Sequence, residues 1–144
     1  MTNPGYVLLA DDNSTDAELT MRALEIGGVS RSIIWVQDGQ AALDYVFRTG
    51  AYAHRAAGNP RLMLLDLHMP KIDGLDVLAR IKQNAQTRSI PIVIMSSSDQ
   101  ESDMARSYGE YANSYIVKPV DFKLFTEQVS QLGRYWMSVN RALG

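Results

Sequence analysis

The sequence contains no cysteine among its 144 residues. A disulfide framework, a cysteine zinc site and a cysteine nucleophile are therefore excluded, and the absence agrees with a reducing compartment. No apolar run approaches the ~20 residues that a transmembrane helix needs. Residues 1–12 also lack the charged start and long apolar core of a signal peptide. We therefore expect a cytoplasmic protein that does not associate with a membrane.

An excess of charge of either sign is also missing. The 14 basic and 16 acidic residues are mixed along the chain and give a net charge of −2. No basic stripe marks a nucleic-acid surface, so we expect no nucleic-acid partner. What is present, 46% hydrophobic and 21% charged residues, is the composition of an ordinary globular protein. The length suffices for one domain with its own hydrophobic core.

Short apolar runs alternate with segments of helical period along the whole chain. The runs predict buried strands at 6–10, 32–36, 61–67, 90–96 and 114–117. The helical segments cover 14–27, 40–48, about 75–81, 98–111 and the chain from residue 121 onward. The stretch 49–60, rich in glycine and alanine, predicts a long loop or a frayed helix end.

This alternation predicts an α/β fold with helices on both faces of a parallel sheet. We predict the flavodoxin-like, doubly wound arrangement of five strands in the order 2-1-3-4-5. In that order the first and third strands are neighbours at the switch point, and ligands bind beyond their carboxyl ends.

Polar side chains stand at the ends of the predicted strands. Asp11 and Asp12 follow the first strand, and Asp66 closes the third. Adjacent carboxylates raise each other's pKa unless a positive charge holds them. Ser96 and Lys118 close the fourth and fifth strands on the same rim. Because oxygen ligands suit Mg²⁺ and lysine suits phosphate oxygens, the set predicts a site for both. Without Asp66, the pair of Asp11 and Asp12 would be interpreted as a strand-to-helix turn whose charges complement the helix dipole. With Asp66 beside them, a metal site is favoured.

Four blocks carry a family resemblance: "LLADDN", "LMLLDLHMPKIDG", "PIVIMSSS" and "SYIVKP" resemble the response-regulator receiver domain, of the chemotaxis-receiver type. The likeness spans residues 5–140 and implies a single receiver domain over 1–144 without an output domain. It implies a stand-alone response regulator of a two-component system or phosphorelay. The implied partner is a sensor histidine kinase that supplies a phosphohistidine. The chain would then be no enzyme, catalysing only its own phosphorylation and dephosphorylation.

The resemblance also implies a role for each site residue. Asp66 would be the phosphoacceptor, through an acyl phosphate. Asp12 would bind Mg²⁺ (or Mn²⁺) directly and Asp11 mostly through water, with Asp66 and the backbone carbonyl of His68 as further ligands.

On the opposite side of the acceptor, Ser96, helped by the Ser97 amide, would hydrogen-bond one phosphoryl oxygen, and Lys118 would pair with another. Tyr115 would be the switch aromatic that fills the space vacated by Ser96. The peptide before Pro119 is expected to be cis, as it usually is in receivers.

Two further stretches, "ANSYIVKPVDF" (112–122) and "GRYWMSVNRA" (133–142), resemble the single-domain regulators associated with phytochromes. They imply a phytochrome-type kinase and a homodimer formed through the fourth helix, fifth strand and fifth helix. Tyr135, Trp136 and Met137 are consecutive, so at least one of them is expected to face outward.

Two other functions compete with this interpretation. A Mg²⁺-dependent phosphatase with an aspartyl nucleophile uses similar residues, but it usually opens with Asp-x-Asp where this chain has "ADDN", and no cap domain is present. A flavodoxin-like nucleotide binder needs a glycine-rich loop where "DDNST" stands.

Several smaller predictions concern single residues. We expect Asn13 or Ser14 to cap the first helix. Asp38 is expected on a solvated face, and the His68 side chain at the rim rather than on a metal. Ser98 either caps the fourth helix or tunes the lifetime of the acyl phosphate.

Overall fold

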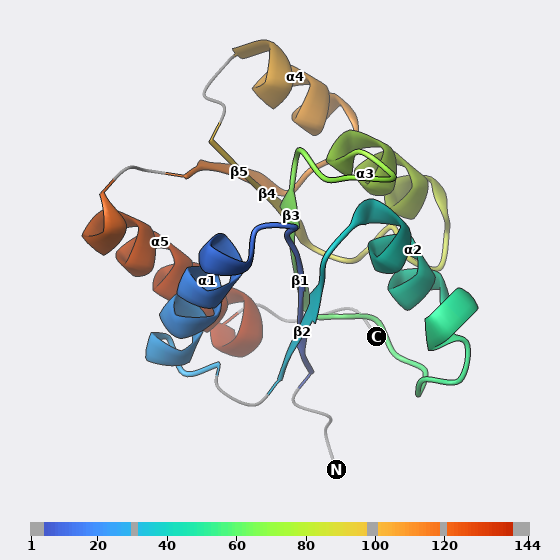
Figure 1. Cartoon of the computed structure of the whole chain (residues 1–144), viewed down its shortest axis with the longest axis horizontal. Helices are drawn as coiled ribbons and strands as arrows, with labels where there is room; N and C mark the ends of the chain where they lie inside the picture. The colour runs from blue at the N-terminus through green and yellow to red at the C-terminus, as the bar shows by residue number, and fades with distance from the viewer. Residues whose placement is uncertain (1–4, 30–31, 98–100, 119–120, 140–144) are drawn as a thin grey trace.

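The computed structural model of the chain describes residues 5–29, 32–97, 101–118 and 121–139. Its strands are β1 (Val7–Ala10), β2 (Ile33–Val36), β3 (Leu62–Asp66), β4 (Ile92–Ser96) and β5 (Ser114–Val117). Its helices are α1 (Ser14–Ile26), α2 (Gly39–Phe47), α3 (Gly74–Gln83), α4 (Glu101–Gly109) and α5 (Phe122–Arg134). Strand and helix alternate along the chain, as the sequence predicts (Figure 1). Within the described ranges, none of the helices combines the length and the apolar character that crossing a bilayer requires.

The strands form one sheet in the order β2-β1-β3-β4-β5, and every neighbouring pair is parallel. The predicted fold class and strand order are therefore confirmed. Parallel pairing brings all carboxyl ends to one edge of the sheet. Ala10 is paired with Leu65, and Asp66 with Met95, so the residues that end β1, β3 and β4 lie side by side.

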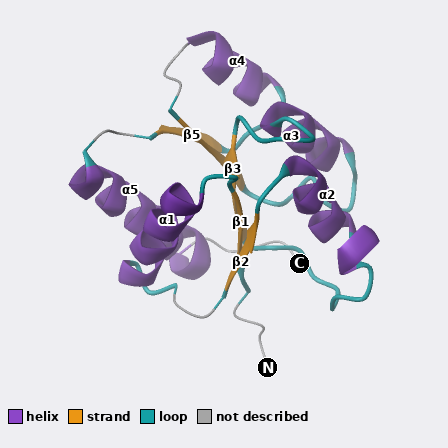
Figure 2. Ribbon diagram, viewed as in Figure 1, coloured by secondary structure: helices purple, strands orange, loops and turns teal. Residues whose placement is uncertain are grey.

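Helices cover both faces of the sheet (Figure 2). On one face Leu8, Met63 and Ile92 pack with α2 and α3, and on the other Leu9, Leu64 and Val93 pack with α1 and α5. Successive strand residues thus alternate between two buried surfaces. This double burial is why the strands are continuous apolar runs rather than alternating ones.

Polar side chains fix the starts of three helices. Asn13 accepts a hydrogen bond from the Asp16 amide at 3.0 Å and so caps α1, as one of the two predicted alternatives. Asp121 caps α5 through the amides of Lys123 and Leu124. Asp38, predicted on a solvated face, instead caps α2 through the Ala41 amide at 2.7 Å. A cap of this kind stabilises a helix by about 1 kcal/mol.

The stretch 49–60 is a loop, as one of the two predicted alternatives, with a single turn of 3₁₀ helix at its start. It begins with a short 3₁₀ helix, Gly50–Tyr52, and Arg55 then folds back onto the end of α2. The Arg55 guanidinium donates to the Tyr45 carbonyl at 2.6 Å and lies 4.3 Å from the centre of the Tyr45 ring. The sequence prediction missed this because the carbonyl acceptors at a helix end have no sequence signature.

The last helix buries only part of its apolar residues. Phe125 and Val129 are buried, whereas Phe122, in the first turn of α5, is 52% exposed. A π-helical turn, Tyr135–Val139, follows α5. Within it Tyr135 is 48% exposed while Trp136 packs on the core, which confirms the predicted outward residue.

Candidate functional site

Three carboxylates converge at the carboxyl edge of the sheet. Asp11 and Asp12 follow β1 directly, and Asp66 is the last residue of β3, the neighbouring strand. One oxygen from each carboxylate lies within 4.8 Å of the others. The sequence prediction that these acids share one crevice is therefore matched by their positions.

The three acids differ in their surroundings. Asp11 is 2% exposed, and its Oδ1 accepts the Asn13 amide at 3.0 Å. Its backbone carbonyl accepts a hydrogen bond from Trp35 Nε1 at 2.8 Å. Asp12 is exposed and Asp66 partly buried. The cluster therefore combines a buried, hydrogen-bonded carboxylate, Asp11, with a carboxylate open to solvent, Asp12.

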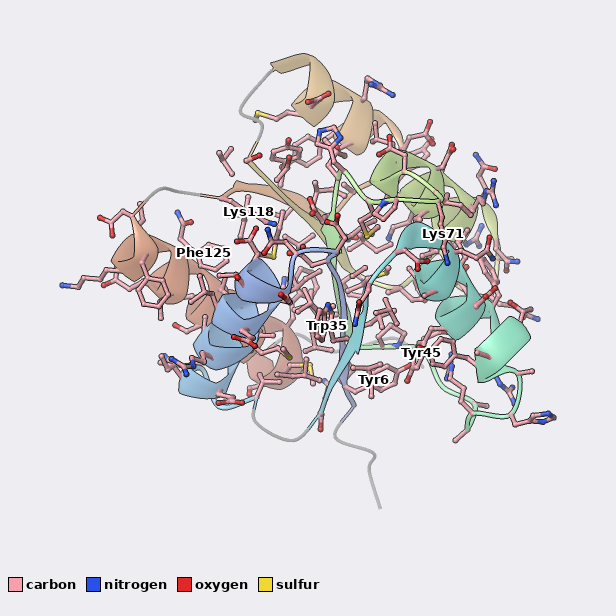
Figure 3. The ribbon with its side chains drawn as sticks, viewed as in Figure 1. Tyr6, Trp35, Tyr45, Lys71, Lys118 and Phe125 are labelled. Atoms are coloured by element: carbon pink, nitrogen blue, oxygen red, sulfur yellow. The ribbon has the colours of Figure 1, made fainter. Side chains whose placement is uncertain are left out.

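Lys118, the residue after β5, supplies the positive charge that the acids require. Its Nζ lies 3.0 Å from Asp11 Oδ2 and 3.7 Å from Asp66 Oδ2. A third carboxylate, Asp16 of α1, also contacts it at 3.1 Å. The Lys118 side chain is only 13% exposed. Figure 3 shows Lys118 beside the first turn of α1, at the edge of the sheet where the strands end.

These contacts shift the pKa values of Asp66 and Lys118. Burial raises the pKa of Asp66 to about 6, and the charges of Asp11 and Asp12 add to this, while Lys118 and the His68 amide oppose it. Burial alone would lower the pKa of Lys118, but Asp66, Asp11 and Asp16 more than offset it, so that its pKa lies above the ordinary value. At neutral pH the site therefore combines a mainly ionised carboxylate with a protonated ammonium.

Ser96 and Tyr115 lie on the neighbouring strands. Ser96 ends β4 and is fully buried, and its carbonyl accepts the Lys118 amide at 2.7 Å, which holds β5 against the site. Tyr115 lies in β5, is partly buried and packs against the core on the α2 and α3 side. The two residues predicted for the switch are therefore on adjacent strands.

A tight turn joins the acceptor strand to α3. The His68 amide lies 3.4 Å from Asp66 Oδ1, whereas the His68 side chain is 67% exposed and 4.0 Å from Asp73. Lys71 takes a left-handed conformation with φ of 69°. A Cβ on Gly74 would collide with the Asp66 carbonyl, so only glycine lets α3 begin this close to the strand.

Asp16 is the residue of this site that the sequence prediction missed. Asp16 lies in the first turn of α1, where an acid ordinarily complements the helix dipole, so it did not stand out as a site residue. Its position one turn after Asp12 was an available signal, since helix and strand end meet at one rim. Two predictions, the cis peptide at Pro119 and the role of Ser98, lie outside the described residues.

The donor set fits a hard divalent cation. Three carboxylates within 4.8 Å offer oxygen ligands of the kind that Mg²⁺ and Mn²⁺ accept, with room for water because Asp12 is exposed. The adjoining ammonium of Lys118 provides a second positive contact for an anion.

Comparison with known proteins agrees with this architecture. A family model described as the response regulator receiver domain matches residues 7–130. A probable methanogenesis regulatory protein, FilR2 of Methanothrix harundinacea, is 40% identical over 99% of this chain and 90% of its own. The phosphorylated cyanobacterial phytochrome response regulator RcpA superposes with a TM-score of 0.89 at 34% identity, over 97% of this chain and 99% of its own. The Mn²⁺-bound form of Rcp1 superposes with a TM-score of 0.89 at 32% identity, over 98% and 100%. Rcp1 belongs to Synechocystis.

Proposed function

Since this chain belongs to the response-regulator receiver family, we propose that it accepts a phosphoryl group on Asp66 from a phosphohistidine of a sensor kinase. The observation that carries the proposal is the ammonium of Lys118 among three carboxylates at the ends of adjoining strands. Phosphoryl transfer depends on positioning and on neutralising charge, and this site supplies both.

Asp66 is the nucleophile of the proposed reaction. One of its carboxylate oxygens forms a bond to phosphorus, the phosphorus–nitrogen bond of the donor breaks, and the released imidazole nitrogen takes a proton. A pKa of about 6 leaves Asp66 mainly ionised at neutral pH, so the attacking oxygen carries the charge that it needs. The chain modifies itself and turns over no external substrate.

Asp11, Asp12, Asp66 and the carbonyl of His68 are proposed to hold Mg²⁺ or Mn²⁺. The Mn²⁺-bound form of the relative Rcp1 supports this assignment, as does the oxygen donor set. When bound there, the ion supplies positive charge against the phosphoryl group and the acceptor carboxylate.

Lys118 and Ser96 are proposed to contact the phosphoryl oxygens. A hydrogen bond drawing Ser96 toward that group would open space beside β5, and Tyr115 is proposed to move into it. The population then shifts toward a second arrangement of α4, β5 and α5, because only that arrangement gains these contacts.

The partners are proposed from the relatives and from the exposed surface. RcpA is a phytochrome response regulator, which supports a phytochrome-type kinase as the donor. Tyr108, Tyr111, Phe122, Leu124 and Tyr135 are large exposed side chains on and around α4 and α5. Such aromatic residues favour protein contacts, and we assign this surface to a homodimer. The proposed setting is the cytoplasm.

The proposal is tested with a small phosphodonor such as acetyl phosphate and Mg²⁺, followed by intact mass. The wild type should gain one phosphoryl group in an acid-labile linkage, and Asp66→Asn should gain none. Asp76→Asn, which removes an exposed acid from the first turn of α3, is the matched control and should label normally. Labelling that persists in Asp66→Asn would indicate a nucleophile at Asp11 or Asp12, as in an aspartyl phosphatase.

A further inference from the structure

We propose that Asp16 is a positioning residue that holds the Lys118 ammonium in place for the phosphoryl group. The proposal rests on the function proposed above and adds a residue to it. The observation is the contact between Asp16 Oδ2 and Lys118 Nζ at 3.1 Å, which joins the first turn of α1 to the end of β5.

The contacts of Lys118 divide its donors between separate acceptors. An ammonium has three N–H groups. One is directed to Asp11 Oδ2 at 3.0 Å and one to Asp16 Oδ2 at 3.1 Å. Asp66 Oδ2, at 3.7 Å, lies beyond hydrogen-bonding distance. The gap of 3.7 Å is too short to hold a phosphorus atom and a further oxygen in line, so a phosphoryl oxygen on Asp66 would lie beside it. The third N–H of Lys118 can turn to such an oxygen while the other two keep Asp11 and Asp16.

Of the two carboxylates that hydrogen-bond to Lys118, Asp16 is the one outside the carboxylate cluster suited to a metal. Asp11 belongs to the carboxylate cluster suited to a metal, and an oxygen shared between two cations binds each less tightly. Asp16 is not among the clustered acids. Its partner in the described part of the chain is Lys118. When Asp11 takes part in metal binding, Asp16 is therefore the carboxylate that keeps the ammonium aimed at Asp66.

Hydrogen bonds on both sides hold the backbone of Asp16, from which its carboxylate reaches Lys118. Its amide is bound by the capping side chain of Asn13 at 3.0 Å, and its carbonyl accepts the Thr20 hydroxyl at 2.9 Å. The lysine, by contrast, has a flexible stem of four carbons that loses rotamer entropy when its ammonium is held in one place. The Lys118 side chain is 13% exposed and that of Asp16 40%, so solvent screens the pair from the Asp16 side only.

The first experiment needs no metal and no reaction. The Lys118 ammonium of the uniformly ¹⁵N-labelled, metal-free protein is observed by NMR and assigned by its loss in Lys118→Met. In Asp16→Ala its hydrogen exchange with water should accelerate about fivefold or more, because a charge-assisted hydrogen bond is lost. Asp16→Glu should restore slow exchange, and Glu18→Ala, an exposed acid on the same helix, should leave it unchanged. Unchanged exchange in Asp16→Ala would overturn the proposal.

The second experiment measures the rate of labelling by acetyl phosphate with Mg²⁺. Asp16→Ala should label about tenfold more slowly than the wild type, because a misplaced charge stabilises the transition state less well. Asp16→Glu should recover most of the rate, and Glu18→Ala should stay within about twofold, as for a distant surface change.

The two experiments distinguish failure of the positioning role of Asp16 from failure of the proposed phosphorylation of Asp66. If the wild type labels and Asp16→Ala labels as fast or faster, the positioning role is wrong and the phosphoacceptor proposal stands. If the wild type takes no phosphoryl group, the proposed function fails, and the position of Lys118 is still decided by the exchange measurement.

Discussion

Two partly buried lysines at opposite ends of the sheet have contrasting environments. Lys118, at the carboxyl ends, lies among Asp11, Asp16 and Asp66. Lys82, the next-to-last residue of α3, lies at the amino ends, where its Nζ donates to the carbonyls of Ile90 at 2.6 Å and Arg88 at 3.1 Å.

A third bond of Lys82 goes to the side-chain oxygen of Asn113 at 3.0 Å, which also accepts the Ile92 amide. All three acceptors of Lys82 are uncharged. Burial lowers the pKa of Lys82 to about 8, whereas the acids around Lys118 raise its pKa.

The difference separates a cation that only joins structural elements from the one proposed to contact the phosphoryl group. Lys82 joins the loop after α3 to the starts of β4 and β5, and its three bonds are complete. Lys118 lies among an excess of negative charge, and within the described residues two of its three N–H donors are directed to Asp11 and Asp16, which leaves the third for the side of Asp66. The negative charge that Lys118 leaves uncompensated suits a divalent cation, and perturbed titrations of this kind gather at functional sites.

The largest expected effect comes from removing each ammonium and measuring labelling by acetyl phosphate with Mg²⁺. Lys118→Met should slow labelling about 100-fold, the usual cost of losing one preorganised contact to a developing charge. Lys82→Met should label within about twofold of the wild type, since its bonds lie at the other end of the sheet. The readout is the initial rate of mass gain at matched protein concentration. Similar losses in the two variants would remove the distinction between the lysines.

A smaller effect is expected on the free energy of unfolding. For that quantity, unlike for labelling, replacing Lys82 should have a clear effect. Lys82→Met leaves Ile90 O and Asn113 Oδ1 without this donor, so the free energy of unfolding should fall by about 2 kcal/mol. The measurement is urea denaturation followed by circular dichroism at pH 7.

The matched control for that measurement is Lys123→Met, which removes an exposed lysine of α5 and should change stability by about 0.5 kcal/mol or less. A Lys82→Met variant as stable as Lys123→Met would show that the bonds at the amino ends are replaced by water without cost.

The contrast also explains what the sequence could predict. Strands buried on both faces must be continuous apolar runs, so their positions and order followed from pattern and topology rules. Asp11, Asp66 and Lys118 were found because they close such strands, and parallel pairing sends all strand ends to one edge.

The position of a residue at a strand end does not predict residues whose contacts form only when distant segments fold together. Lys82 has the position of an ordinary cation in the last turn of a helix, and only folding brings Arg88, Ile90 and Asn113 around it. Asp16 has the matching position of an acid in a first turn. In both cases the helix dipole already explains why a residue of that charge lies at that end of the helix. Nothing in the sequence therefore indicated a contact with a distant residue.

The smallest predicted effect is a pair of opposite slopes in stability against pH. The folded pKa of Asp66, about 6, exceeds its ordinary value, so the folded state binds more protons between about pH 4 and 6 and stability falls as pH rises through that window. The folded pKa of Lys82, about 8, lies below the ordinary 10.5, so the unfolded state binds more protons between these values and stability rises with pH there. After allowance for solvent screening, each change is on the order of 1 kcal/mol. Urea denaturation of the metal-free protein across pH should lose the acidic slope in Asp66→Asn alone and the alkaline slope in Lys82→Met alone. A single variant that removed both slopes would mean that the two ends of the sheet titrate as one coupled system, against their separation in the fold.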